Sequence, residues 1–339
     1  GTLQAQSFLL DNGAQSQTFR QAAVFENKGN LALSGLLQLR GAGRISNRNV
    51  IQAEGLTVDQ GEGHVATGGA TLLENAGDIA LVGEARLRDM ARIDNSGGWL
   101  AASLQVDNAT DGLHNSGNLK VAQVGLRQVG ASSNTGRWSS QNATLSQSGV
   151  LTNRADMDIE GLQLNQTSLD NEGRLKSGHV GVTQAELLRN GAGGQWVTRD
   201  RLQAQNIAEW RNQGRLVVGE LQAAEVALFD NQAEMALTRG GRWQGEQFTS
   251  SRSLYSLGDL SLQAKTLTLS GSLQGKQVSA SATHATLRDL KASLTAIELA
   301  ASGSAQLQQA RLQATDKVAL SAASLTLTDS SLQAPLLQG

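Results

Sequence analysis

The chain has 339 residues and a formal net charge of −2, with 28 lysines and arginines against 30 aspartates and glutamates. This balance gives no electrostatic reason to expect a nucleic-acid partner or attraction to an anionic membrane. Cysteine is absent, which excludes disulfides and cysteine-ligated metals, and no apolar run is long enough to insert in a bilayer.

A short pattern dominates the chain from Asn27 onward. It reads as an apolar residue, any residue, asparagine, any residue, glycine or alanine, any residue, and a second apolar residue; Leu113–Leu119 is the clearest copy. Between Asn75 and Asn231 the asparagine recurs at intervals of 18 to 22 residues. A fixed period near 20 residues predicts a solenoid. The asparagines of the clear copies are Asn27, Asn75, Asn95, Asn115, Asn153, Asn171, Asn212 and Asn231, and weaker copies surround Asn12, Asn47, Asn134 and Asn190.

The spacing inside each unit indicates strands. Apolar residues occur in pairs two apart, as in Leu104/Val106 and Val124/Leu126, and this is the period of a β-strand with alternate side chains facing inward. Each unit therefore holds about three short strands, and one unit buries its apolar face only when stacked on its neighbours. We predict an all-β fold, a parallel β-helix with coils of about 20 residues. We expect a right-handed helix, because the coil length varies.

The repeated asparagine and the glycine two residues later are expected to form a corner of the coil. Both residue types tolerate a positive φ, and stacked asparagine side chains form hydrogen-bonded amide ladders. The tryptophans Trp99, Trp138 and Trp210 take positions that hold Leu, Ile, Met or Phe in other units, so we expect them in the core.

Two segments depart from the repeat. Between Asn47 and Asn75 the interval grows, and the extra residues, about 59–69, are expected to protrude as a loop that includes Glu62 and His64. After residue 238 the asparagine corner is lost. We divide the chain into a β-helix with asparagine corners over 1–238, an irregular junction over 239–258, and a continued β-helix with Ser-, Thr- and Ala-rich turns over 259–339.

The junction is one candidate receptor-binding surface, and the loop is the other, through Glu62 and His64. Arginine, tryptophan and tyrosine are enriched at binding hot spots. The alternative is a change of register in which Trp243 and Phe248 fill the core. The candidate contact residues of the junction are Arg239, Arg242, Trp243, Arg252 and Tyr255.

Several other residues are of types that form metal or binding sites. The histidines are far apart in sequence, and for His114 a turn or surface position is favoured over a metal site. Asp156, Asp158 and Glu160 alternate along one strand and offer three outward carboxylates to Ca²⁺, but the calcium-binding glycine-rich repeat is absent and a solvated face is favoured. Arg86, Arg88 and Arg92 are expected on the surface. We expect no metal and no cofactor.

The repeat resembles the haemagglutinin repeats of filamentous-haemagglutinin-like exoproteins. Leu113–Val121 and Ile93–Ala101 are close copies, and the resemblance covers residues 25–237 well and 258–334 loosely. Members of this family are very large proteins of Gram-negative bacteria, secreted by two-partner secretion, and include adhesins and contact-dependent growth inhibition exoproteins. The resemblance implies a right-handed β-helical filament at the cell surface, exported by an outer-membrane partner that acts on the full-length protein.

The expected function is therefore a non-catalytic segment of a secreted filament, a stalk that also presents or contains a surface for a target-cell receptor, protein or glycan. The pattern runs at both ends of the chain, so we expect an internal segment of a longer protein. A Val-Glu-Asn-Asn pretoxin motif is absent, and no toxin activity is carried over. The alternative is a β-helical enzyme that acts on polysaccharides, although no acidic position recurs at a fixed phase of the repeat.

Overall fold

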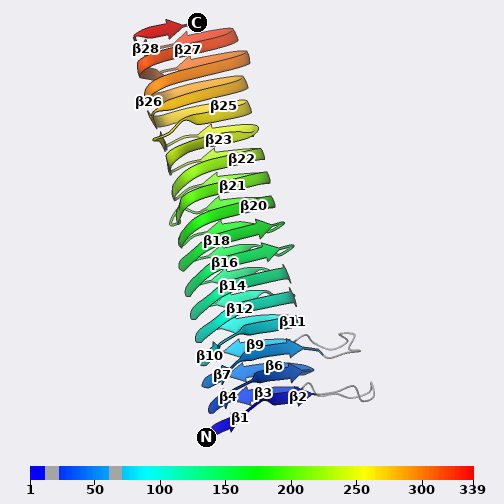
Figure 1. The fold of residues 1–339 in the computed structure, drawn as a ribbon. Helices are drawn as coiled ribbons and strands as arrows, with labels where there is room; N and C mark the ends of the chain where they lie inside the picture. The colour runs from blue at the N-terminus through cyan, green and yellow to red at the C-terminus, as the bar shows by residue number, and fades with distance from the viewer. Residues whose placement is uncertain (12–22, 61–70) are drawn as a thin grey trace. The chain divides into compact units, whose positions relative to one another are not determined.

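A computed structural model of the chain describes residues 1–11, 23–60 and 71–339. These residues form two compact units, Gly1–Ser168 and Leu169–Gly339. The described ranges contain β-strands and no helix, and strands of successive coils pair in parallel in each unit (Figure 1). The predicted all-β parallel β-helix is confirmed. The unit boundary falls within the asparagine repeats, not at residues 239–258 where the repeat changes.

The strands of the first unit are β1 (Thr2–Ala5), β2 (Phe8–Asp11), β3 (Ala23–Asn27), β4 (Asn30–Leu33), β5 (Leu36–Arg40), β6 (Ala42–Asn47), β7 (Val50–Ala53), β8 (Gly55–Asp59), β9 (Thr71–Asn75), β10 (Asp78–Leu81), β11 (Glu84–Asn95), β12 (Gly98–Ala109), β13 (Leu113–Asn115), β14 (Asn118–Val129), β15 (Ser132–Asn134), β16 (Arg137–Ser146), β17 (Leu151–Asn153) and β18 (Asp156–Asn165). The strands of the second unit are β19 (Leu169–Asn171), β20 (Arg174–Asn190), β21 (Gln195–Asn212), β22 (Arg215–Asn231), β23 (Glu234–Ser250), β24 (Ser253–Ser256), β25 (Leu260–Gly275), β26 (Gln277–Gln308), β27 (Arg311–Thr328), β28 (Ser331–Gln333) and β29 (Leu336–Gln338).

Three parallel ladders run through the first unit, and they define three faces of its coils. Face A contains β4, β7, β10 and the start of β12. Face B contains β5, β8, the start of β11 and the middle of β12. Face C contains β6, β9, the end of β11 and β13. Each coil thus contributes three strands, as the spacing of apolar pairs predicted.

The core consists of side chains stacked in register from successive coils. On face B, Val106 of β12 pairs with Leu126 of β14, which pairs with Leu145 of β16, and all three are buried. On face A, Trp99 and Trp138 are also buried, as is Trp210 in the second unit, which confirms their expected place in the core. Burying one such aliphatic side chain contributes about 1.5–3 kcal/mol, and the contribution repeats in every coil.

The expected positive φ at the asparagine corner is wrong. None of the corner asparagines adopts it, and in the first unit the left-handed residues instead form a row at the corner between faces B and C. The glycine after the asparagine serves close packing: a Cβ on Gly117 would lie 2.1 Å from the carbonyl oxygen of Gly97, one coil earlier. The non-glycine residues with a left-handed backbone in the described part of the first unit are Asp89, Asn108, Gln128, Gln147 and Gln166, with φ between 51 and 63°.

The corner chemistry changes towards the C-terminal end of the second unit. Asn231 pairs with Ser250, Ser250 pairs with Leu269, and the row continues with buried leucines. Gly271, Asp289, Gln309 and Asp329, with φ of 76, 51, 53 and 50°, then provide left-handed residues. Buried leucine therefore replaces asparagine, where small residues were expected. The expected irregular junction is corrected as well, because β23 and β24 cover residues 239–250 and 253–256 and pair in parallel with β25.

Candidate functional site

The structure places the corner asparagines in one hydrogen-bonded row in each unit. Each Nδ2 donates to the Oδ1 of the next asparagine along the row, and the bonds are 2.7–2.9 Å long. The row of the first unit is Asn27, Asn47, Asn75, Asn95, Asn115, Asn134 and Asn153. The row of the second unit is Asn171, Asn190, Asn212 and Asn231, which donates to Oγ of Ser250 at 3.0 Å.

The second donor hydrogen of these amides is also used. Asn115 donates to the carbonyl oxygen of Arg137 at 3.0 Å, and Asn75 to that of Gly98 at 2.9 Å. Because the side chains are buried and their polar atoms are satisfied by neighbouring coils, these asparagines hold coils together and are not positioned to contact a ligand.

The residues expected to contact a receptor do not form one surface. Trp243 is fully buried and packs against Phe248, with ring centroids 5.1 Å apart, so its role is core packing. Arg242 is exposed on β23 and pairs in register with Ser261 of β25. Tyr255 is 38% exposed on β24, in a different ladder, where it pairs with Ala236. Arg252 is exposed between β23 and β24.

The other receptor candidate, the loop around residues 59–69, lies largely outside the described residues. Glu62 and His64 both lie outside the described residues, so their contact with a receptor stays a prediction.

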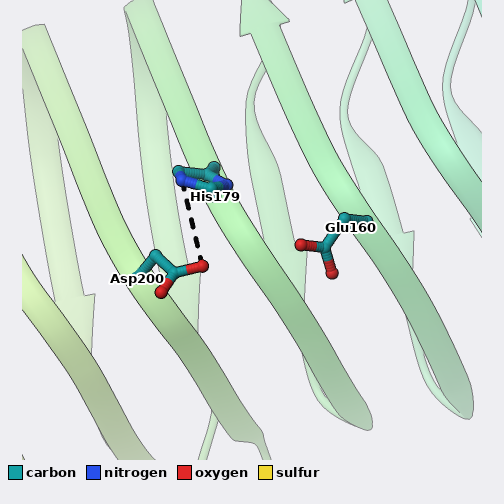
Figure 2. Close-up of side chains that lie close together, drawn as sticks. All are labelled: Glu160, His179 and Asp200. Carbon is teal, nitrogen blue, oxygen red and sulfur yellow. Dashed lines mark ion pairs between the residues drawn. The ribbon is translucent and has the colours of Figure 1, made fainter.

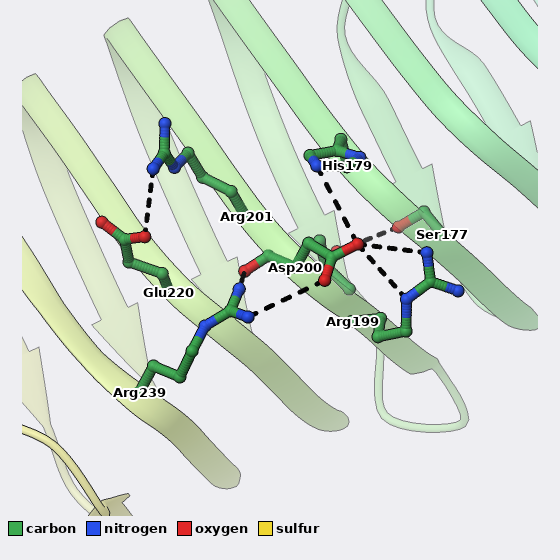
Figure 3. A network of polar contacts seen from close by, with 8 residues as sticks. Ser177, His179, Arg199, Asp200, Arg201, Glu220 and Arg239 are labelled. Atoms are coloured by element: carbon green, nitrogen blue, oxygen red, sulfur yellow. Dashed lines mark hydrogen bonds and ion pairs between the residues drawn. The ribbon is translucent and has the colours of Figure 1, made fainter.

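Arg239 belongs instead to a charged network around Asp200 in the second unit (Figure 3). Asp200 Oδ2 lies 3.1 Å from Nη2 of Arg199, and Asp200 Oδ1 lies 3.8 Å from Nη1 of Arg239. Arg239 also donates to the backbone oxygen of Asp200. His179 Nε2 lies 3.9 Å from Asp200 Oδ2, and the two side chains face each other in Figure 2.

A second pair extends this network. Arg201 Nη2 lies 3.2 Å from Oε2 of Glu220, and Gln222 donates to Oε1 of Glu220 at 2.7 Å. The hydrogen bond from Gln222, followed by that from Arg201, lowers the pKa of Glu220. The hydrogen bond from Arg199 is the main cause that lowers the pKa of Asp200. Both carboxyl groups are therefore held ionised and paired, which does not suit a general acid.

Sequence reasoning did not find this network, and the reason is local. The register between β20 and β21 shifts between Ser177 and His179, and that between β21 and β22 shifts between Thr198 and Arg201. A β-bulge changes which face a side chain takes, so a strict alternation of two does not place these residues. The signal available in the sequence was the three consecutive charges Arg199, Asp200 and Arg201.

The remaining candidates have ordinary surface contacts. His114 Nδ1 lies 2.8 Å from Oγ of Ser133, and its Nε2 lies 2.9 Å from the carbonyl oxygen of Asp111. Asp156, Asp158 and Glu160 are exposed on β18. The arginines of the small basic group have acidic neighbours: Arg86–Glu84 at 2.9 Å, Arg92–Asp94 at 2.8 Å and Arg88–Asp107 at 4.0 Å.

Each unit also has a hollow in its surface. That of the second unit, about 610 Å³, is lined by small residues such as Ser279, Ser281 and Ala300, and its only carboxylate, Glu298, pairs with Lys317 at 3.3 Å. That of the first unit, about 340 Å³, lies on face B around Gly125.

Comparisons with protein-family models, with curated proteins and with solved structures found no match to this chain. Among the described residues there is no helix of the length and apolarity required to cross a bilayer.

Proposed function

We propose that this chain is a non-catalytic segment of a secreted cell-surface filament, an adhesin or a contact-dependent inhibition exoprotein. In this function it acts as a stalk and contains or presents a surface that binds a receptor on a target cell. The observation that supports a stalk best is the repetition of one coil. In each unit the same hydrogen bond between side-chain amides recurs from coil to coil, as from Asn75 to Asn95 at 2.7 Å in the first and from Asn190 to Asn212 at 2.9 Å in the second.

A coil of this kind suits a structural role for a physical reason. Each coil contacts only its neighbours, so stability is a sum of similar coil-to-coil terms and the length can change without a new fold. A finished coil also presents a strand edge and an amide on which the next coil forms. Ordered growth of this kind fits export as an unfolded chain by an outer-membrane partner and a final location on the surface of a Gram-negative bacterium.

The receptor is proposed to be a protein or glycan of the target cell. The test is binding of the purified, fluorescently labelled chain to Gram-negative cells, measured by flow cytometry and competed with unlabelled chain. Saturable binding supports the proposal. The double variant Arg242→Ala/Tyr255→Ala tests the exposed residues retained from the sequence analysis, with Arg252→Ala as a separate variant. If no Gram-negative cells of the panel bound the chain saturably, a receptor-binding surface would be contradicted and only the structural role as a stalk would remain.

The alternative of a polysaccharide-acting enzyme has no particular observation in its favour. Two-carboxylate glycoside hydrolysis requires a second acidic group beside the first, and in the larger hollow Glu298 is the only one. Incubation with defined polysaccharides, followed by measurement of new reducing ends or unsaturated products, tests it directly.

A further inference from the structure

The hollow on face B of the first unit is built around a glycine. Gly125 of β14 pairs with Gln105 of β12 on one side and with Thr144 of β16 on the other. Gln123 and Arg127 flank Gly125 on its own strand with side chains facing outward. These residues line a space of about 340 Å³, at the lower end of the roughly 300–1,000 Å³ that is usual for ligand sites.

The walls of the hollow carry polar groups that the protein does not use. The side chains of Gln105, Gln123, Asn142 and Thr144 line it, and within the described part of the chain none of the four makes a hydrogen bond. Three of them are carboxamides, each with donors and an acceptor, and the fourth is a hydroxyl that can do both. This differs from the buried amides of the corner row, which are fully satisfied.

The charges in the hollow cancel. Among its lining residues the one carboxylate, Asp107, accepts a 2.8 Å hydrogen bond from Nε of the one cation, Arg127. The groups that remain for a ligand are therefore uncharged. A ligand that fits them offers several groups that both donate and accept hydrogen bonds and carries no net charge.

We infer that this hollow binds a sugar ring of a neutral oligosaccharide. The vicinal hydroxyls of a sugar are donor and acceptor at once, which matches the free carboxamides of Gln105, Gln123 and Asn142. The inference rests on the proposed function and specifies its receptor as a glycan. The backbone of Gly125 lies at the floor with the carboxamide of Gln105 across it, so a ring that enters the hollow meets a flat strand and this carboxamide.

The lack of a side chain at Gly125 also makes room for the carboxamide of Gln105 in the wall of the hollow. A Cβ on Gly125 would lie 2.0 Å from Oε1 of Gln105 and 2.9 Å from its Cδ, so the carboxamide of Gln105 lies across the glycine. Any larger residue at position 125 both fills the floor and displaces Gln105. Because the displaced group is the end of a flexible side chain, such a substitution changes the hollow and leaves the strand intact.

The experiment is binding of the full chain to an array of immobilised neutral, sialylated and sulfated oligosaccharides, followed by titration with the best neutral glycan. Gly125→Thr fills the hollow with a residue that favours strands, and Gln105→Ala/Asn142→Ala removes two carboxamides. Gln38→Ala is the matched control, because Gln38 faces outward in the same row of face B and pairs with Thr57 of β8. Circular dichroism and thermal unfolding establish that each variant is folded.

The expected result is affinity for a neutral glycan that falls at least tenfold in both test variants and changes less than twofold in Gln38→Ala. Neutral-glycan binding that both folded test variants retain would overturn the inference, as would binding confined to anionic glycans or no binding to any array member. The cell-binding assay is independent of these outcomes. Saturable cell binding that Gly125→Thr leaves unchanged would reject the hollow as the binding site while supporting the proposed function. If the parent chain bound neither glycans nor cells, both the glycan site and the receptor-binding function would be rejected.

Discussion

Asn115 accepts a hydrogen bond from Asn95 at 2.7 Å and donates one to Asn134 at 2.7 Å, so a single side chain links three successive coils. Its second donor hydrogen is bound to the carbonyl oxygen of Arg137 at 3.0 Å. Removing this amide also leaves Asn95 and Asn134 each without one hydrogen-bond partner. The leucines that follow Ser250 keep the row buried by replacing the polar groups of several coils together.

The first prediction concerns this row. Asn115→Leu leaves the Nδ2 of Asn95 without its acceptor and the Oδ1 of Asn134 without its donor, and should lower stability by about 2–4 kcal/mol, since each unsatisfied buried group costs about 1–3 kcal/mol. The exposed neighbour Ser116→Ala should change stability by less than about 0.5 kcal/mol. Urea unfolding with amide hydrogen exchange of the first unit measures both. Equal stability of the two variants would show that the amide row does not hold the coils.

The second prediction separates close packing from backbone conformation at the corner. Gly117→Ala places a Cβ 2.1 Å from the carbonyl oxygen of Gly97. Backbone must move to accept it, so we expect a loss of about 1–3 kcal/mol, as for other overpacked sites. Gly193→Ala is the control, because the nearest atom to its Cβ is the carbonyl oxygen of Glu172 at 3.4 Å. Thermal unfolding should place the two variants clearly apart, and similar midpoints would contradict a packing role for Gly117.

The third prediction concerns the left-handed row. Gln128 has a φ of 53° and is exposed. A left-handed conformation costs a non-glycine residue about 1–2 kcal/mol, so Gln128→Gly should leave stability unchanged or raise it slightly. Gln128→Val should lower stability, because a branched Cβ is more strained there. The difference between the two variants in thermal unfolding is the measurement. A valine variant as stable as the glycine variant would mean that the backbone at this corner is not fixed.

The coil could be predicted from the sequence because it depends on period and polarity. The spacing of two between Leu104 and Val106, repeated at each interval, is sufficient to place three strands in a coil and to predict which side chains face the core. The amide row follows from the same repeat. Where the repeat is regular, the sequence therefore predicts which residues of successive coils stack on one another.

The surface sites could not be predicted in the same way. Arg199 and Asp200 take their places through register shifts between strands, and such bulges leave no fixed signature in the sequence. The hollow at Gly125 depends on which residues lie one coil before and one coil after, Gln105 and Thr144, and the repeat does not fix the residue type at outward-facing positions. The aromatic side chain of Trp243 suggests a contact at an interface, but the large apolar surface of a tryptophan equally favours burial in the core when a coil has room for it.

The fourth prediction compares two buried tryptophans. The Nε1 of Trp196 donates to Oγ1 of Thr198 at 3.0 Å, whereas the Nε1 of Trp243 has no partner within the described residues. Trp196→Phe therefore loses a buried hydrogen bond, although the Thr198 hydroxyl keeps its 3.0 Å contact with Oγ of Ser177, while Trp243→Phe removes an unsatisfied donor. We expect Trp196→Phe to be the more destabilising by about 1 kcal/mol. Cell binding of folded Trp243→Phe should equal that of the parent chain, since the ring is buried.

The last prediction concerns the pKa of Asp200. Its carboxyl group has a lowered pKa, chiefly because Arg199 donates a hydrogen bond to it, and the charge of Arg239 lowers the pKa less than the charges of Arg199 and His179 do. A lowered pKa means that the ionised carboxylate stabilises the folded state above the unfolded pKa, and that this contribution is lost as the pH falls through the lowered value. The Asp200 side chain is partly exposed, at 31%, so the effect should weaken in high salt. Titration of the Asp200 carboxyl carbon by NMR should show the pKa rising most in Arg199→Ala, less in Arg239→Ala and not at all in Arg252→Ala. If Arg239→Ala raised the pKa of Asp200 more than Arg199→Ala did, the contact from β23, two strands along the ladder, would dominate and the network would have to be reassigned.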